Sequence, residues 1–294
     1  MNRRQFVTAT AAFCAELTGC SPPRPNHPVI GAKNFTEQVV LGELLAQEIE
    51  AKARVPVERR FYLAGSYICN QALVAGRIDA YVEYTGTALT AILKQPLDRD
   101  PARVLATVQN LYQQKNQIMV EPPLGFENTF AMVIRSDDAQ RLHLITLSQA
   151  AKVTPQWHLG VGYEFEQRPD GLPGLEQAYG LKFAGPPRTM DLGLLYRALN
   201  EHQVDMIAAN STDGQIAEFG LTVLEDDRHY FPPYQAVPLV RDAALQRWPA
   251  IGAAALALAG KVDADAMRAM NEAVDAQHRD PADVVRAFRA RLGV

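Results

Sequence analysis

The stretch at residues 78–87 is Ile78-Asp79-Ala80-Tyr81-Val82-Glu83-Tyr84-Thr85-Gly86-Thr87. Its first half has the β-branched and aromatic composition of a strand, and the Thr-Gly-Thr that follows is typical of a turn. Tyr84 and Thr87 therefore lie at the strand end, whereas Tyr81 is expected to point into the core. Aromatic faces beside hydroxyl groups suit a small zwitterion, whose cationic end packs on rings while its carboxylate accepts hydrogen bonds.

Strand and helix patterns alternate along the chain before this stretch. We expect strands at residues 28–32 and 55–63 and helices at residues 36–52 and 66–74. Asn34 and Thr36 are suited to cap the first of these helices. Repeated β-α-β units predict an α/β fold in which helices cover a largely parallel sheet.

Two proline-rich segments interrupt this alternation in matching ways. Residues 121–124 and 230–234 each contain a double proline, and each precedes an apolar run. Double prolines end regular elements and keep the chain extended. Two such crossings suit a protein of two lobes, with lobe 1 at residues 29–124 plus 236–294 and lobe 2 at residues 125–235. The alternative is one continuous domain with two proline-rich surface loops.

The N-terminal residues have the pattern of an export signal. An arginine pair at positions 3 and 4 precedes a mostly apolar stretch, and Leu17-Thr18-Gly19-Cys20 resembles the lipobox of bacterial lipoproteins. We predict a lipoprotein signal peptide at residues 1–19, Cys20 as the lipid anchor and a proline-rich tether at residues 20–28. A plain signal peptide with an incidental cysteine is the alternative, and the arginine pair also suits twin-arginine export. The expected location is the periplasm or cell envelope, with membrane contact through the N-terminal lipid only.

The composition argues against several classes of function. The chain has 29 Lys and Arg against 33 Asp and Glu, a formal net charge of −4, and no basic tract for nucleic acid. Of the three cysteines, Cys14 and Cys20 belong to the N-terminal segment, and Cys69 is expected to be a small core residue. The six histidines are scattered, and no nucleophile–base pair or metal-ligand spacing stands out. We therefore predict neither an enzyme nor a metal or cofactor.

Five motifs follow one another along the chain after residue 28. They are Gly31-Ala32-Lys33-Asn34-Phe35-Thr36-Glu37-Gln38, the stretch at residues 78–87, Glu164-Phe165 with Arg168-Pro169-Asp170-Gly171, Asn210-Ser211-Thr212-Asp213-Gly214, and Leu224-Glu225-Asp226-Asp227 through Phe231-Pro232-Pro233-Tyr234. Together they resemble the glycine betaine/choline-type substrate-binding proteins of ABC importers for osmoprotectants. The resemblance implies a type II periplasmic-binding-protein fold, with two α/β lobes that close over ligand at a two-crossing hinge. It also implies an ABC permease with its ATPase as the partner.

The resemblance further implies an aromatic cage for a quaternary ammonium group. Tyr84 and Tyr234 match two of its walls, and Phe130 stands at a position that is usually tyrosine. Asn210 departs from the pattern, which has a tyrosine directly before Ser-Thr-Asp-Gly. Such a group has no N–H to donate, so ring faces are its natural partners, at about 0.5–2 kcal/mol for each contact.

The same resemblance implies three other residues that bind the carboxylate of the ligand. Lys33, Thr87 and Arg168 match the groups that hold it, and Thr87 is also placed to cap a helix beginning near Ala88. Because Lys33 belongs to lobe 1 and Arg168 to lobe 2, ligand binding is expected to pull the lobes together.

These features predict an extracytoplasmic solute-binding protein that delivers a zwitterionic or quaternary-ammonium osmoprotectant, such as glycine betaine or choline, to an ABC permease. Because Asn210 and Phe130 replace two phenols, a different small polar solute is an open alternative, and Tyr67 or Phe126 could supply a replacement ring. A protein that reports ligand occupancy to a membrane receptor is a second alternative. An enzyme on the same two-lobed fold is the third.

Overall fold

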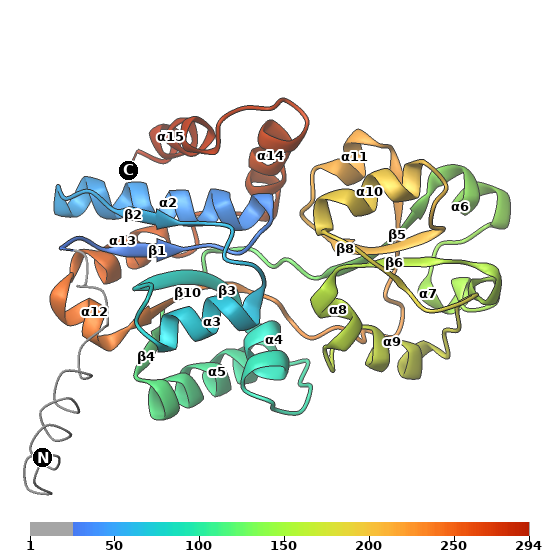
Figure 1. Cartoon of the computed structure of the whole chain (residues 1–294), viewed down its shortest axis with the longest axis horizontal. Helices are drawn as coiled ribbons and strands as arrows, with labels where there is room; N and C mark the ends of the chain where they lie inside the picture. Colours follow the sequence, from blue (N-terminus) through green and yellow to red (C-terminus); the bar gives the residue numbers. More distant parts are fainter. Residues whose placement is uncertain (1–25, 294) are drawn as a thin grey trace, which may run out of the picture.

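The structure is a computed structural model that describes residues 26–293. It consists of two halves, each built on a five-stranded sheet with helices packed around it (Figure 1). The proposed signal peptide, Cys20 and most of the tether lie outside the described residues. Within the described range, no helix is both long and apolar enough to cross a bilayer.

The two sheets have the same architecture. The strand orders are β2-β1-β3-β10-β4 and β7-β6-β8-β5-β9. The bounds are β1 (Val29–Gly31), β2 (Glu58–Arg60), β3 (Ala80–Tyr84), β4 (Ile118–Val120), β5 (Phe130–Arg135), β6 (Leu159–Val161), β7 (Arg188–Thr189), β8 (Met206–Asn210), β9 (Leu221–Leu224) and β10 (Ala236–Arg241). The α/β class is confirmed. Each sheet is largely parallel, as expected, with one exception: β10 in the first sheet and β5 in the second arrive from the other sheet and run antiparallel to both neighbours.

Helices surround both sheets. Those around the first sheet are α2 (Thr36–Ala53), α3 (Ser66–Val74), α4 (Thr85–Thr87), the π-helical turn η1 (Ala88–Ile92), α5 (Pro101–Asn116), α12 (Asp242–Arg247), α13 (Ala250–Leu258), α14 (Ala264–Asp275) and α15 (Pro281–Leu292). Those around the second are α6 (Ser136–Leu142), α7 (Leu147–Ala150), the 3₁₀ turn η2 (Thr154–Gln156), α8 (Tyr163–Gln167), α9 (Leu172–Tyr179), α10 (Leu192–Asn200) and α11 (Gln215–Glu218).

Local sequence predicted α2 and α3 well and β2 poorly. The strand expected at residues 55–63 is only three residues long, since Pro56 has no N–H to donate and Tyr62 has a φ of 59°. The expected cap of α2 is also absent. Phe35 is the N-cap, without a side-chain hydrogen bond, and the Thr36 hydroxyl donates to Asp275 of α14 at 2.5 Å instead.

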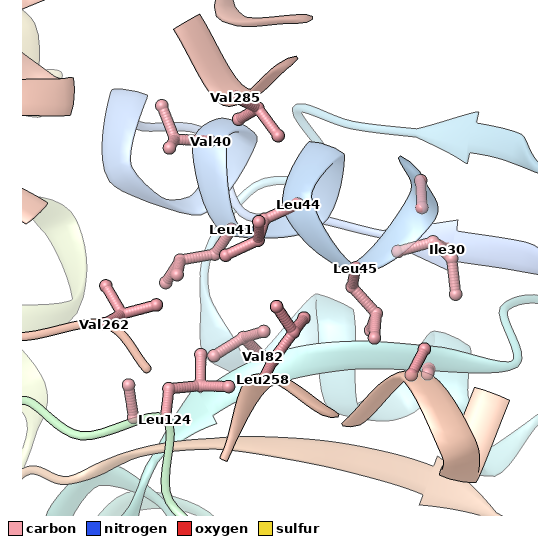
Figure 2. Packing of buried hydrophobic residues seen from close by; sticks show 14 of the residues in the cluster. Ile30, Val40, Leu41, Leu44, Leu45, Val82, Leu124, Leu258, Val262 and Val285 are labelled. Carbon is pink, nitrogen blue, oxygen red and sulfur yellow. The ribbon is translucent and has the colours of Figure 1, made fainter. Parts of the chain in front are cut away.

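Helix α2 is the centre of the core in the first half. Leu41, Leu44 and Leu45 pack toward Val82 of β3 and Leu258 of α13, as Figure 2 shows. Its opposite side meets α15. Because α2 is buried on both sides along most of its length, the residues at its N-terminal end have a rigid support.

Two connecting segments run between the sheets, one from β4 to β5 and the other from β9 to β10 (Figure 1). They lie side by side, since Asn128 donates its backbone N–H to the Tyr234 carbonyl at 3.1 Å and residues 127 and 235 form an antiparallel bridge. Tyr234 is thereby held between the two halves.

Candidate ligand-binding site

A cavity of about 440 Å³ lies between the two halves. All seven residues predicted to contact ligand line it: Lys33, Tyr84, Thr87, Phe130, Arg168, Asn210 and Tyr234. The first three come from the first half, the next three from the second, and the last from a connecting segment. The fold thus brings together residues that are far apart in the sequence.

Arg168, directly after α8, lies at the polar end of the cavity. Its Nε and Nη2 donate to the two oxygens of Asp170 at 3.0 and 2.5 Å, and Nη2 also donates to Thr87 Oγ1 at 3.0 Å. Tyr234 donates its hydroxyl to Asp170 at 2.7 Å. Burial opposes ionisation of Asp170, but the charge of Arg168 outweighs it and lowers the pKa of that carboxyl group. Arg168 Nη1 has no hydrogen-bond partner among residues 26–293.

Thr87 acts differently from the expected cap. Residues 85–87 form the helical turn α4, which continues into η1, and the Thr87 side chain makes no capping hydrogen bond there. Its oxygen accepts from Arg168, so its O–H is a donor at the cavity wall.

Lys33 supplies a second cation to the cavity wall. It follows β1, is buried, and pairs through Nζ with Glu83, whose side chain is fully buried. Nζ also lies 4.8 Å from the ring centroid of Tyr84. Because both cations are paired, the Lys33–Glu83 and Arg168–Asp170 groups are formally neutral together, which suits a neutral zwitterion better than a free anion.

Aromatic rings cover much of the remaining wall. The Phe130 ring lies 4.7 Å from Phe165 and 5.6 Å from Tyr234 between centroids, and Arg168 Cζ lies 4.9 Å from its centre. Tyr67 lines the cavity, as anticipated for a replacement ring, whereas Phe126 is buried in the core of the first half and does not.

Sequence reasoning missed three further aromatic residues of the wall. Phe35, Tyr163 and Phe165 line the cavity. Two of them stand inside motifs that carried the family resemblance, so the motifs marked the right places without showing which side chain faces inward. Tyr81 and Cys69 lie outside the site as expected, both fully buried, and burial raises the pKa of the Cys69 thiol to about 12.

Below the cavity, the Glu37 carboxylate joins several elements. It accepts from the Tyr84 hydroxyl at 2.5 Å and from Asn128 Nδ2 at 2.9 Å. It also accepts from the Thr212 hydroxyl of the second half at 2.5 Å and from Asn271 of α14 at 3.1 Å. Desolvation raises the pKa of Glu37 although all four hydrogen bonds oppose the rise. This network holds Tyr84 in place and ties the two halves together beneath the cavity.

Asn210 ends β8, where the family pattern has an aromatic residue. Its Nδ2 donates to Asp213 at 3.2 Å, and its backbone N–H donates to the same carboxylate at 3.1 Å. The Tyr196 hydroxyl donates to Asp213 at 2.8 Å. In the described part of the chain, no donor bonds Asn210 Oδ1.

The buried Asp213 predicts a pH dependence of stability. Desolvation raises the pKa of Asp213 from 3.8 to about 7, against the hydrogen bond from Tyr196. Between about pH 4 and pH 7 the folded state therefore binds more protons than the unfolded state, so this group makes stability fall as pH rises through that range. We expect the melting temperature of wild type to drop by several degrees more than that of Asp213→Asn between pH 5 and pH 7.5. Parallel curves in a thermal-melt series would contradict this assignment.

Two α/β halves with mixed sheets, joined by two connecting segments around an aromatic-lined cavity, define a solute-binding protein of the type II periplasmic-binding-protein fold. The chain belongs to the family described as the substrate binding domain of ABC-type glycine betaine transport systems, whose model matches residues 28–291. It is therefore a substrate-binding component of ABC transport and not an enzyme. Proteins of this family work outside the cytoplasm.

Individual relatives agree with this placement. The ergothioneine transport permease/ergothioneine binding protein EgtU of Helicobacter pylori (strain G27) is 32% identical over 90% of this chain, which spans only 48% of that protein's length. The glycine-betaine-binding protein of Pseudomonas aeruginosa is 31% identical, covering 98% of this chain and 94% of its own. A crystal structure titled as a glycine betaine/carnitine/choline ABC transporter superposes with a TM-score of 0.73 at 31% identity, covering 90% of this chain and 98% of that one.

Proposed function

We propose that this protein binds a small zwitterion with a quaternary ammonium group in the 440 Å³ cavity and delivers it to an ABC permease. One observation carries the proposal: two buried cations, Lys33 and Arg168, and the Thr87 hydroxyl line a cavity that several aromatic rings also line, and Arg168 Nη1 has no hydrogen-bond partner in the described part of the chain. Three ligands named for the relatives, glycine betaine, carnitine and ergothioneine, combine the two charges of a zwitterion, whereas choline, which is also named, has the ammonium group alone.

The ligand carboxylate fits the polar end. Arg168 Nη1, the Thr87 hydroxyl and the remaining N–H groups of Lys33 are its proposed donors, and each bond is charge-assisted. The ammonium group is proposed to pack against the rings of Tyr84, Phe130 and Tyr234. The cations of Lys33 and Arg168 already lie near the rings of Tyr84 and Phe130. We therefore propose Phe165 as a fourth ring against which the ammonium group of the ligand packs.

Calorimetry tests this proposal. We expect the purified protein to bind at least one of glycine betaine, proline betaine and carnitine with micromolar to millimolar affinity. Choline is the matched control, since it keeps the ammonium group and lacks the carboxylate, and we expect it to bind at least about tenfold more weakly. If none of these three zwitterions, nor N,N,N-trimethylhistidine, binds at millimolar concentration, the proposal fails, and binding of ectoine alone would point to a different small polar solute.

We also propose that residues 29–124 plus 236–294 close against residues 125–235 as ligand binds. Contacts between the halves support this. Glu164 of α8 accepts a hydrogen bond from the backbone N–H of Tyr67, in the first turn of α3, at 3.2 Å. The Glu164 carboxylate thus also lies at the N-terminal end of α3, which is the positive end of the helix dipole.

Gly65 makes this contact sterically sensitive. A Cβ at Gly65 would lie 2.2 Å from Glu164 Oε1, while the φ of −87° itself permits alanine. We expect Gly65→Ala to weaken ligand binding about fivefold to tenfold by displacing Glu164. Combined with Glu164→Ala, it should add no further loss, and Gly185→Ala, whose Cβ would meet nothing within 4 Å, is the control. Additive losses in the double variant would show that Gly65 acts independently of Glu164.

Export and anchoring are proposed from the N-terminal pattern. Arg3, Arg4, the apolar stretch and Leu17-Thr18-Gly19-Cys20 support a lipoprotein signal peptide at residues 1–19 with lipid on Cys20. Mass spectrometry of protein from the membrane fraction should find a lipid-modified N-terminal Cys20. Protein released in soluble form with an unmodified Cys20 would contradict the anchor.

A further inference from the structure

We infer that the ligand carries a hydrogen-bond donor away from its ammonium group, and that Asn210 Oδ1 accepts from it. This inference rests on the proposed function and specifies the class of zwitterion. It begins at the position where the cavity has an amide in place of an aromatic wall.

The orientation of the Asn210 amide is determined by its partner. Its Nδ2 lies 3.2 and 3.4 Å from the two oxygens of Asp213, and above the pKa of that group, about 7, only the NH₂ end of an amide can bond to the ionised carboxylate. Asp213 is itself held by the Asn210 backbone N–H and by the Tyr196 hydroxyl. The amide oxygen must therefore be the end that Asn210 presents elsewhere.

That oxygen has no donor among residues 26–293, although Asn210 lines the cavity. An acceptor that loses water on ligand binding without gaining a donor costs free energy. A plain trimethylammonium group has no hydrogen to donate, so glycine betaine would leave this oxygen unsatisfied. A ligand with an N–H or O–H on its body would satisfy it.

The neighbouring wall can accommodate such a body. Met190 and Leu192 line the same cavity and offer apolar contact, while Asp191 and Glu164 add two carboxylates. Apolar surface with several acceptors suits a polar group attached to a larger carbon frame, and a compact methylated head needs rings instead. A ring N–H and a chain O–H are both donors of the kind that Asn210 Oδ1 would accept.

Calorimetry with three ligands tests whether the ligand carries this donor, and whether the donor is an O–H or an N–H. Glycine betaine has no such donor, carnitine has a hydroxyl, and N,N,N-trimethylhistidine has a ring N–H. We expect wild type to bind one of the donor-bearing ligands at least about tenfold more tightly than glycine betaine. The better of the two identifies the donor as O–H or N–H.

Asn210→Leu tests the residue, because it removes the acceptor while retaining similar size. We expect this variant to bind the preferred ligand about tenfold more weakly and glycine betaine within about threefold of wild type. Asn200→Leu, at the exposed end of α10, is the matched control and should change neither affinity. A thermal melt of each variant shows whether it is folded.

Four outcomes would overturn the inference. Glycine betaine binding as tightly as both donor-bearing ligands would contradict the acceptor role, as would equal losses for all ligands in Asn210→Leu. Tight binding of glycine betaine alone would refute the inference while leaving the proposed function intact. Absence of binding by all three and by choline would instead overturn both.

Discussion

Arg168→Ala is expected to weaken ligand binding about 100-fold. The substitution removes the Nη1 donor, releases Thr87 and leaves the fully buried Asp170 side chain without its cation. Breaking a buried charge pair by removing one partner costs on the order of 3–5 kcal/mol, so we also expect a lower melting temperature. Calorimetry with the best ligand and a thermal melt measure the two effects separately.

A second buried arginine provides the control. Arg135 of β5 is also buried and pairs with Asp138 and Asp205, but it does not line the cavity. Arg135→Ala should lower stability to a similar degree and leave the affinity of the folded protein unchanged. If Arg168→Ala keeps its affinity within threefold of wild type, the carboxylate of the ligand is not held at this end.

Gly86→Ala is expected to weaken binding at least about 30-fold. A Cβ at Gly86 would lie 2.7 Å from two ring carbons of Tyr234 and 2.8 Å from the Pro233 carbonyl oxygen. The carbonyl belongs to the backbone of a connecting segment and cannot rotate away, so overpacking should cost about 1–3 kcal/mol and move the Tyr234 ring. That movement would break the hydrogen bond from Tyr234 to Asp170, which helps to position Arg168.

Gly193→Ala is the matched control for this effect. Gly193 lies on the exposed side of α10, and a Cβ there would meet nothing within 4 Å. We expect unchanged affinity and a slightly higher melting temperature, since alanine favours a helix interior over glycine by about 1 kcal/mol. If Gly86→Ala binds as well as Gly193→Ala, the close approach of Tyr234 is not needed for the site.

Much of the framework could be predicted from local sequence. Residues 36–52 and 66–74 have apolar spacing that matches helices α2 and α3, because helical periodicity is a property of the neighbouring residues themselves. Six of the seven proposed contact residues stand in the five motifs and Phe130 came from the family resemblance outside them, and the structure places all seven around one cavity. The inward direction of Phe165 and Tyr163 was not predictable, since it depends on how α8 packs.

Hydrogen-bond partners were the least predictable feature. Thr36 and Thr87 both looked like helix caps, the usual local use of a threonine. In the structure their hydroxyl groups bond to Asp275 and Arg168, which are distant in sequence and adjacent only after folding. The one antiparallel strand of each sheet was not predicted for a similar reason, because β5 and β10 come from the opposite half.

The sequence by itself determined the alternation of strands and helices, the two proline-rich crossings and the residues at 78–87 that mark the site. These depend on side-chain spacing and backbone chemistry within short windows. Only the tertiary structure decided that Lys33 and Arg168 are paired with buried carboxylates, and that Gly86 makes room for Tyr234. It also decided that the amide nitrogen of Asn210 is turned toward the Asp213 carboxylate, at the edge of the cavity that Asn210 lines.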